Sequence, residues 1–186
     1  MVALVARQID DGAVANLGIG MRKRVATHLS AGKEVMLHSE NLVIGEGPAA
    51  AAVEEDHNLI GAGKQPVTLL PGGVFLHHAE SFAMMRGWHW DVCAGRTPGA
   101  SEGAVDLATG ARKTWIRMGH NTMAGEPTLV TACSNPVTGL ACVSRVHTEL
   151  AVLDITPQRA RVRELAEGLD FATLQARTGT PLMLSA

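Results

Sequence analysis

The sequence lacks tyrosine, and among its 186 residues it has only three cysteines, three tryptophans and three phenylalanines. The cysteines, at positions 93, 133 and 142, are odd in number and form no CxxC pair, so they indicate neither a disulfide framework nor a zinc ribbon. With 3% aromatic residues beside 20 glycines, the interior must be built from aliphatic side chains and close backbone approaches. This composition favours a layered α/β architecture.

Long apolar runs and an excess of one charge are also missing. No uninterrupted apolar stretch approaches the roughly 20 residues that cross a bilayer, and Arg7, Asp10 and Asp11 interrupt the apolar residues that a secretory leader would need. Lys and Arg number 16 against 18 Asp and Glu, and neither half of the chain is basic enough for a nucleic-acid face. We therefore expect a cytoplasmic protein with neither a membrane nor a nucleic acid as a partner.

The order of predicted elements indicates one α/β domain over residues 1–186. The first predicted elements are a helix over 2–9, a strand over 14–17, a glycine turn at 18–20, a helix over 21–29 and a strand over 34–37. This is a βαβ pattern, and such units join parallel strands. We therefore predict an open, mainly parallel sheet flanked by helices.

Further along the chain, glycine and proline mark loops between shorter elements. Loops are predicted over 45–57 and 94–103, and the triplet at 71–73 is predicted to end a strand. The predicted strands are 67–70, 90–93, 114–118, 129–131, 151–155 and 161–165. Helices are predicted over 80–86 and 171–177, the second with Asp170 as its N-cap and Gly179 as its C-terminal cap.

Glu40 is the strongest candidate for a reactive side chain. It lies between Ser39 and Asn41, after a predicted buried strand and before a glycine-bearing turn, where open α/β sheets place their ligands. A carboxylate can act as a covalent nucleophile that divides a difficult transfer into two easier steps. Spacing alone favours a plainer alternative, in which Glu40 pairs with an arginine or caps backbone N–H groups.

Two glycines after the first predicted strand form a second candidate feature. Gly18 and Gly20 make half of a dinucleotide-binding fingerprint, but its third glycine is absent. The pattern better fits a tight turn, whose backbone can approach a ligand or the strand that precedes Glu40.

The sequence around Glu40, LHSEN at residues 37–41, resembles the signature of the catalytic glutamate in the B subunits of family I CoA-transferases. The resemblance extends nearly from end to end, in the segments 16–20 (NLGIG), 62–64 (AGK), 81–87 (SFAMMRG) and 150–152 (LAV). Two further segments, 72–78 (GGVFLHH) and 142–146 (CVSRV), are most similar to the B subunits that act on 3-oxoadipate, with the acetoacetate-type enzymes second.

This resemblance implies the family's α/β fold and a ping-pong transfer of CoA from succinyl-CoA to a 3-oxo acid. The favoured acceptor is 3-oxoadipate, and acetoacetate is second. Glu40 would be the nucleophile and would carry CoA as a glutamyl-CoA thioester. The backbone N–H groups of Glu102 and Gly103 would stabilise the oxyanion. The residues expected near the substrate and CoA are Ser39, Asn41, Gly18 and Gly20.

The resemblance also implies a partner but no resident cofactor. Coenzyme A enters as the thioester substrate, so no cofactor is expected. The family takes part of its oxyanion site from a separate A subunit, and we therefore expect a heterodimer or heterotetramer. This chain alone should be inactive.

A shortened, non-catalytic paralogue that keeps the fold and the partner contact is the alternative. Leu42 stands where the family has glycine, and leucine resists a positive φ. Glu102 replaces one of the family's paired oxyanion glycines, and its carboxylate would oppose a developing anion. Between positions 93 and 104 the chain has roughly twenty residues fewer than the family, enough for a strand pair.

A metal site is the alternative from another chemical class. The residues of suitable type in one neighbourhood are His77, His78, Glu80, His89 and Asp91. Adjacent histidines on a strand point to opposite faces, and the spacing matches no HExxH-like motif. We therefore predict no metal ligand, and expect surface or hydrogen-bonded histidines instead.

Overall fold

The structure is a computed structural model that describes residues 2–18, 25, 28–30, 32–38, 42–61, 64–96, 104–133, 137 and 139–184. Its helices are α1 (Val2–Gln8), α3 (His78–Arg86), α4 (Ala104–Thr109) and α5 (Phe171–Ala176). Its strands are β1 (Val14–Leu17), β2 (Met36–His38), β3 (Val43–Ala49), β4 (Val67–Phe75), β5 (Trp90–Arg96), β6 (Ala111–Arg117), β7 (Val143–His147), β8 (Ala151–Ile155), β9 (Ala160–Leu165) and β10 (Leu182–Leu184).

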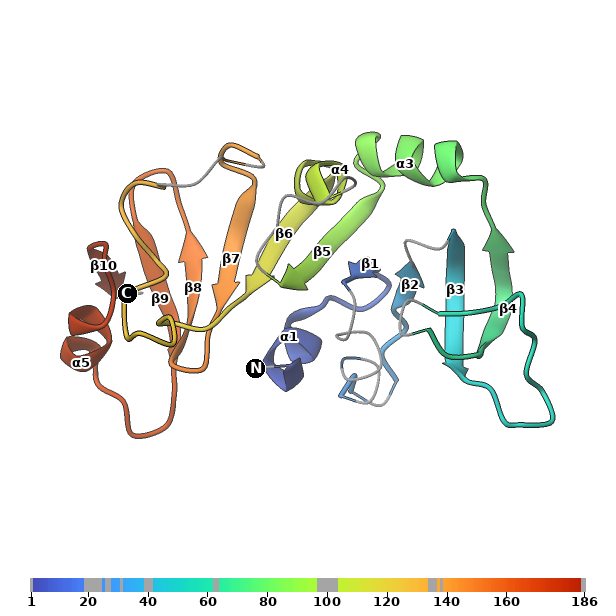
Figure 1. Ribbon diagram of the computed structural model, residues 1–186, viewed down its shortest axis with the longest axis horizontal. Helices are drawn as coiled ribbons and strands as arrows, with labels where there is room; N and C mark the ends of the chain where they lie inside the picture. The colour runs from blue at the N-terminus through green and yellow to red at the C-terminus, as the bar shows by residue number, and fades with distance from the viewer. Residues whose placement is uncertain are drawn as a thin grey trace.

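The ten strands of the described residues form one sheet in the order β10-β9-β8-β7-β6-β5-β1-β2-β3-β4 (Figure 1). The five central strands, from β7 to β2, are parallel to one another. Antiparallel strands continue the sheet on both sides, β3 and β4 beyond β2, and β8 and β9 beyond β7. The predicted α/β fold, with an open, mainly parallel sheet and flanking helices, is confirmed.

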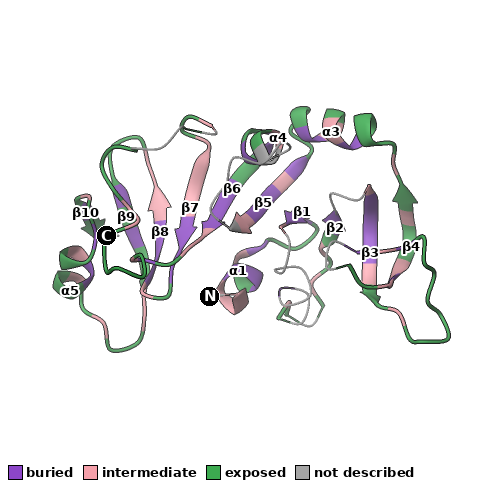
Figure 2. Cartoon of the chain, viewed as in Figure 1, coloured by how far each residue is buried: buried purple, intermediate pink, exposed green. Residues whose placement is uncertain are grey.

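Helices on both faces of the central strands enclose the aliphatic core. The apolar residues at positions 2, 5 and 6 of α1, and Ile9 directly after it, have the spacing of an amphipathic helix and pack against buried residues such as Leu17 and Trp115. On the other face of the sheet, Met85 of α3 packs with Ile44 and Trp90. Figure 2 shows that burial is concentrated in the central strands and decreases towards β4 and β10.

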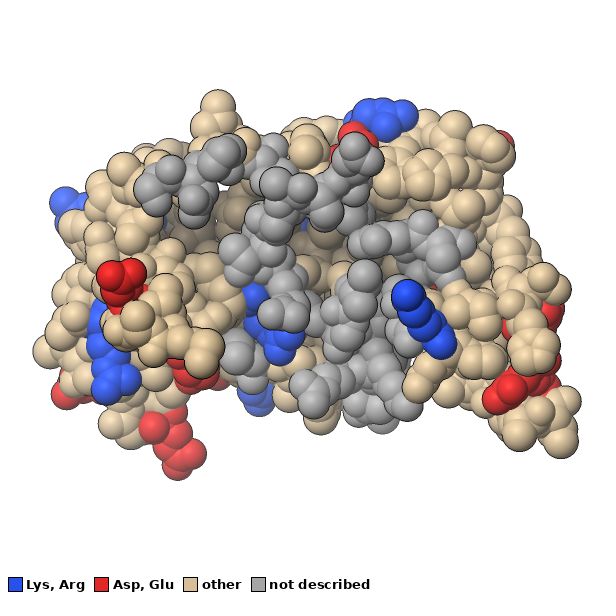
Figure 3. All heavy atoms as spheres, viewed as in Figure 1, with Lys and Arg blue, Asp and Glu red and all other residues tan. Residues whose placement is uncertain are grey.

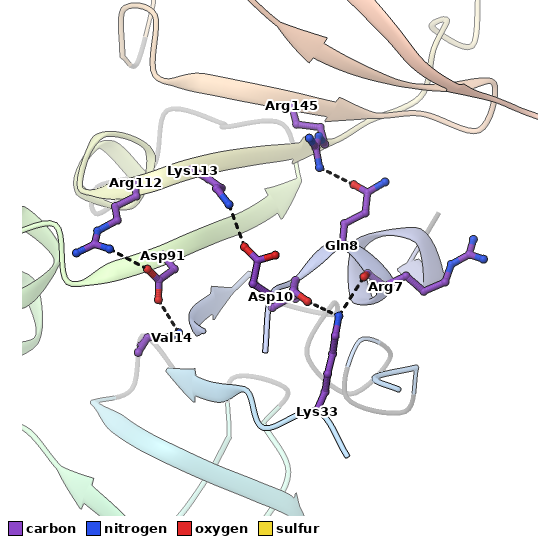
Figure 4. A network of polar contacts seen from close by, with 10 residues as sticks. Arg7, Gln8, Asp10, Val14, Lys33, Asp91, Arg112, Lys113 and Arg145 are labelled. Carbon is purple, nitrogen blue, oxygen red and sulfur yellow. Dashed lines mark hydrogen bonds and ion pairs between the residues drawn. The ribbon is translucent and has the colours of Figure 1, made fainter. Parts of the chain in front are cut away.

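Polar contacts fix the carboxyl end of α1 to its surroundings (Figure 4). The Lys33 ammonium group donates hydrogen bonds to the carbonyl oxygen of Arg7, at 3.1 Å, and to that of Ile9. A cation is stabilising at this end of a helix, where carbonyl groups lack partners within the helix. An ion pair of 3.0 Å between Lys113 and Asp10 joins β6 to the residues that follow α1.

The predicted loop over 45–57 is wrong in its first part, because β3 continues through it. β4 likewise continues past the glycine and proline triplet at 71–73. The two strands pair in antiparallel register, with an irregularity in which residues 70–73 stand opposite Gly45. Gly45 has a φ of +78°, and a Cβ there would lie 2.9 Å from the Gly73 Cα, so glycine is required. Pairing between distant segments thus overrides the local turn signals.

Other predicted boundaries differ in the middle of the chain. β5 extends to Arg96, so part of the predicted loop over 94–103 is strand, and residues 97–103 lie outside the described residues. α4, β7 and β10 have no counterpart among the predicted elements. Most of the helix predicted over 21–29 also lies outside the described residues.

The C-terminal helix confirms one predicted cap and corrects the other. The Asp170 carboxylate accepts a hydrogen bond of 2.7 Å from the Thr173 N–H, as an N-cap does. The helix ends at Ala176, and its C-cap is Arg177 rather than Gly179. Gly179 instead forms an isolated bridge with Val130, so the strand predicted over 129–131 is reduced to this one β-bridge.

The described surface carries charges of both signs. On the face shown in Figure 3, the lysine and arginine side chains lie apart from one another, with acidic side chains among them. The acidic run Glu54, Glu55 and Asp56 is exposed in the connection between β3 and β4. None of the helices in the described ranges is long and apolar enough to cross a membrane.

Candidate active site

The predicted site lies where neighbouring parallel strands end. β1 pairs with β2 on one side and with β5 on the other, so the carboxyl ends of these strands share one edge of the sheet. Glu40 is the second residue after β2 in the sequence. Gly18 is the one predicted site residue that the structure describes. The predicted residues outside the described ranges are Glu40, Ser39, Asn41, Gly20, Glu102 and Gly103.

Gly18 allows the ends of β1 and β5 to approach closely. Its N–H donates a hydrogen bond of 2.9 Å to the Ala94 carbonyl oxygen. A Cβ at position 18 would lie 3.3 Å from the Gly95 Cα, a distance at which the neighbouring backbone would have to move. The close backbone approach is therefore made to β5, whereas the sequence pattern suggested a ligand or the strand before Glu40.

His38, the last residue of β2, is the centre of a buried polar cluster. Its side chain is 0% exposed, and its ring is stacked on the Trp90 ring with centroids 4.4 Å apart. Nδ1 lies 2.8 Å from the Asn16 amide nitrogen, and Nε2 lies 2.8 Å from the Ser81 hydroxyl oxygen. Asn16 and Ser81 are also buried. We call Asn16, His38 and Ser81 the β2 clamp, because they join the end of β2 to β1 and α3.

The residues of the β2 clamp were not recognisable as a cluster from the sequence. Asn16 and Ser81 stand in the segments 16–20 and 81–87, and His38 directly precedes Ser39. Their position beside these motifs is the only sequence signal that points to them. Their contacts join residues that are 22 and 43 positions apart, which no local pattern encodes.

Leu42 adopts the left-handed backbone conformation that a glycine would supply. Its φ is +76°, and its carbonyl oxygen accepts a hydrogen bond of 2.8 Å from the Leu76 N–H. Such a conformation costs an L-residue roughly 1–2 kcal/mol. Leucine is expected to resist a positive φ, yet Leu42 adopts one, so it does so under strain. The connection from β2 to β3, residues 39–42, therefore ends in a strained residue.

Two of the residues considered as metal ligands begin a helix instead. α3 starts at His78, earlier than predicted, so the neighbouring histidines do not lie on a strand. The His77 Nδ1 accepts a hydrogen bond of 3.2 Å from the Ala79 N–H, and the His77 N–H donates one of 2.9 Å to the Glu80 carboxylate. His78 stacks on the Phe82 ring. His77 and Glu80 together cap the first turn of α3.

Asp91, another residue considered as a ligand, joins two strands and an arginine. Its carboxylate accepts a hydrogen bond of 3.0 Å from the Val14 N–H and pairs with Arg112 at 3.3 Å (Figure 4). His89 is exposed. In the described part of the chain, no three His, Cys, Asp or Glu side chains are grouped closely enough to hold a metal ion.

A second buried histidine, His147, lies at the end of β7 on the face covered by α1. Its Nε2 is 3.0 Å from the Gln8 Oε1. The same oxygen accepts a hydrogen bond of 2.9 Å from Arg145, which Figure 4 shows. Arg145 pairs with Asp154 and lies over the Trp115 ring. Burial, followed by the charge of Arg145, lowers the pKa of His147 to about 4, although Asp154 acts in the opposite direction.

We expect His147 to make the chain less stable in mild acid. Its pKa of about 4 in the folded chain lies below the ordinary value of 6.5, so the unfolded chain binds the proton more readily. The contribution of neutral His147 to the free energy of unfolding is fully present above pH 6.5. It is lost as the pH falls to about 4, and the loss is on the order of 3 kcal/mol. Measuring the free energy of unfolding across this range should show a smaller pH dependence in His147→Gln than in the wild type. An equal dependence in both would contradict the prediction.

Comparison with known proteins gives one consistent family. The family described as Coenzyme A transferase matches residues 1–95. The chain is 48% identical to the B subunit of the 3-oxoadipate CoA-transferase of Pseudomonas putida, over 98% of its own length and 94% of that protein. It is 44% identical to the subunit of the same name from Acinetobacter baylyi, over 96% and 91%. It is 35% identical to the B subunit of the probable succinyl-CoA:3-ketoacid coenzyme A transferase of Bacillus subtilis, over 100% and 94%.

The alignment with the Pseudomonas putida protein also measures how short this chain is. It has 203 positions, whereas 98% of the 186 residues is only about 182. About 20 aligned positions therefore hold no residue of this chain. This agrees in length with the shortening predicted between positions 93 and 104.

Two solved structures share the fold. A cysteine-to-serine variant of the decarboxylase AibA/AibB superposes with a TM-score of 0.72 and 16% identity, over 99% of this chain and 84% of that one. The acyl-CoA transferase YdiF from E. coli O157:H7 superposes with a TM-score of 0.67 and 14% identity, over 99% and 41%. At such low identity, the likeness establishes the fold alone.

Proposed function

Because the chain belongs to the coenzyme A transferase family, we propose that it is the B subunit of an enzyme that transfers CoA from succinyl-CoA to a 3-oxo acid. The observation that carries this proposal is the 48% identity to the B subunit of a 3-oxoadipate CoA-transferase over 98% of the chain. The similar proteins are named as B subunits, so an A subunit would complete the enzyme, in a heterodimer or heterotetramer. Coenzyme A takes part as a reactant, and the proposal requires no resident cofactor.

In the proposed reaction, the Glu40 carboxylate attacks the thioester carbonyl of succinyl-CoA and expels the CoA thiolate, which leaves an acyl-glutamyl anhydride. The thiolate then attacks the glutamyl carbonyl, releases succinate and forms a glutamyl-CoA thioester. The carboxylate of the 3-oxo acid attacks this thioester, and the same steps in reverse regenerate Glu40 and give the 3-oxoacyl-CoA. Each thioester or anhydride that breaks is replaced by another, so the exchange needs no oxidant or reductant.

Each attack creates a tetrahedral oxyanion, which N–H donors must stabilise. We assign this role to the backbone N–H groups of Glu102 and Gly103, together with donors from the A subunit. Removing one preorganised donor raises a barrier of this kind by roughly 3 kcal/mol. The place of Glu40 in the sequence, two residues after the central parallel strand β2, supports its proposed role as the nucleophile, because open α/β sheets bind ligands at the carboxyl ends of their strands.

The favoured acceptor is 3-oxoadipate, and acetoacetate is second. Identity to the subunits named for 3-oxoadipate is 48% and 44%, against 35% to the subunit named for a 3-ketoacid. The two acids differ at the end remote from the reacting carboxylate, since 3-oxoadipate has a second carboxylate there and acetoacetate has a methyl group. A few pocket side chains, some of them from the A subunit, are therefore expected to decide between them.

Intact-mass spectrometry of this chain tests the proposed mechanism. The chain is co-expressed with an A subunit of the family, and the complex is exposed to succinyl-CoA without an acceptor. We expect a mass increase of one CoA on this chain, less water, and no increase in Glu40→Ala. Gel filtration shows whether both versions form the complex. An intact wild-type complex that gains no CoA would contradict the catalytic proposal.

A non-catalytic paralogue that keeps the fold and the partner contact is the second candidate. Two observations favour it: about 20 aligned positions have no residue in this chain, and Leu42 is strained immediately after the segment that carries Glu40. The same experiment separates the two candidates. Complex formation without an adduct is the result expected of the paralogue, whereas an adduct that Glu40→Ala abolishes excludes it.

A further inference from the structure

Contacts with other parts of the chain fix the described residues on each side of Glu40, namely His38 and Leu42. On one side, the β2 clamp fixes His38, whose ring is 0% exposed and whose two nitrogens each contact a buried side chain. On the other side, the Leu42 carbonyl oxygen accepts a hydrogen bond from the Leu76 N–H. Residues 39–41 therefore connect two points whose positions are set by contacts with other parts of the chain.

The orientation of the His38 ring is fully specified by its neighbours. A single neutral tautomer satisfies both polar contacts: the Asn16 amide donates to Nδ1, and the Nε2 proton is donated to the Ser81 hydroxyl. The stacked Trp90 ring restricts tilting. Because the three partners come from β1, α3 and β5, rotation of the ring or displacement of the end of β2 would disturb several elements at once.

We propose that His38 is a positioning residue that orients Glu40 for attack on the acyl-CoA thioester. This inference rests on the proposed function, in which Glu40 is the nucleophile. Two residues of chain span at most about 7 Å, so a displacement of His38 passes to Glu40 with little slack. A misplacement of about 1 Å from the reactive geometry can lower a rate roughly 100-fold. His38 therefore acts on the rate of attack and leaves the binding of succinyl-CoA largely unchanged.

The chain contains a matched control for this role. His120 is also 0% exposed, and its two ring nitrogens contact the hydroxyl groups of Thr148 and Thr178 at 3.1 and 2.9 Å. Its partners lie beside β8 and α5, at the other end of the sheet from β2. Loss of either imidazole leaves a cavity and removes two buried side-chain contacts, but only His38 lies within two residues of the proposed nucleophile in the sequence.

The test uses the complex with the A subunit and measures two quantities. One is the rate at which CoA becomes attached to this chain, and the other is the dependence of that rate on succinyl-CoA concentration. In His38→Ala we expect the maximal rate to fall about 100-fold, with a half-saturating concentration within about threefold of the wild type. In His120→Ala we expect the maximal rate to stay within about threefold. Unfolding curves of all complexes show whether the two variants lose comparable stability.

Two milder variants keep the test informative if His38→Ala does not fold. Ser81→Ala removes one contact of the clamp, and we expect a fall of about tenfold in the maximal rate. His38→Gln keeps a neutral donor and acceptor on a side chain of similar reach. We expect its maximal rate to be at least tenfold above that of His38→Ala. If His38→Ala is unfolded, the rate of His38→Gln should equal or exceed that of Ser81→Ala.

Each result supports or overturns the inference. A wild-type rate in folded His38→Ala or Ser81→Ala would overturn it, and so would an equal loss of rate in His120→Ala, which would indicate a general effect of instability. A change confined to the half-saturating concentration would also overturn it. If the wild-type complex itself forms no adduct, the proposed function fails and this inference fails with it. That outcome is distinguishable, because it is read from the wild type alone.

Discussion

Glu40→Gln is expected to lower the turnover of the reconstituted complex at least about 1000-fold. The substitution keeps the size of the side chain but replaces a nucleophilic carboxylate with an amide, so the covalent route is lost. A 1000-fold decrease corresponds to about 4 kcal/mol of barrier. Formation of the 3-oxoacyl-CoA product, followed spectroscopically with 3-oxoadipate as the acceptor, measures the effect.

Glu54→Gln is the control for this prediction. Glu54 is an exposed carboxylate in the connection between β3 and β4, and the same chemical change there should leave turnover within about twofold of the wild type. If Glu40→Gln retained more than a few per cent of the wild-type turnover, Glu40 could not be the nucleophile. The carboxylate that reacts would then have to be sought elsewhere in the complex.

Leu153→Ala is expected to have the largest effect on stability, a loss of about 3 kcal/mol in the free energy of unfolding. Leu153 lies in β8 and is 0% exposed. It belongs to the cluster that joins β8 and β9 to α5 through Leu174 and Val162. Truncation removes buried methyl groups and leaves a cavity that the surrounding strands cannot fill.

Urea unfolding of this chain measures that loss. The midpoint should fall in Leu153→Ala with little change in slope, because the surface exposed on unfolding is nearly the same. Leu140→Ala is the matched control, since Leu140 is 87% exposed and its truncation should change the free energy by less than about 0.5 kcal/mol. Similar losses in both variants would show that Leu153 is not buried as described.

The sequence predicts strands that are continuous apolar runs better than strands that contain glycine, proline or charged residues. The strands β1 and β8 are predicted to the residue, because each is a short apolar run with clear punctuation. β3 is missed because Gly45 and two further breakers resemble a loop, and only its pairing with β4 reveals a strand. β7 is missed because Arg145 and His147 interrupt its apolar pattern, and their polar groups find partners on α1 and β8.

The residues of the candidate site also divide into those that the sequence indicates and those that only the structure reveals. Glu40 and its neighbours are recognised from a contiguous motif, whereas the positive φ of Leu42 is the opposite of what a leucine favours. The β2 clamp is not predicted, because a histidine in a sequence does not indicate whether it is buried. Its hydrogen-bond partners, Asn16 and Ser81, come close to His38 only when β1, β2 and α3 are assembled.

The irregularity between β3 and β4 also bears on aggregation. β4 is the last strand on its side of the described sheet, and its exposed side chains include Leu70, Val74 and Phe75. An exposed apolar edge of this kind can recruit strands from other chains. Here Pro71 has no N–H to offer, and residues 70–73 bulge out of register, so the row of backbone donors and acceptors is broken. The feature that made this strand hard to predict thus opposes edge-to-edge association of this chain.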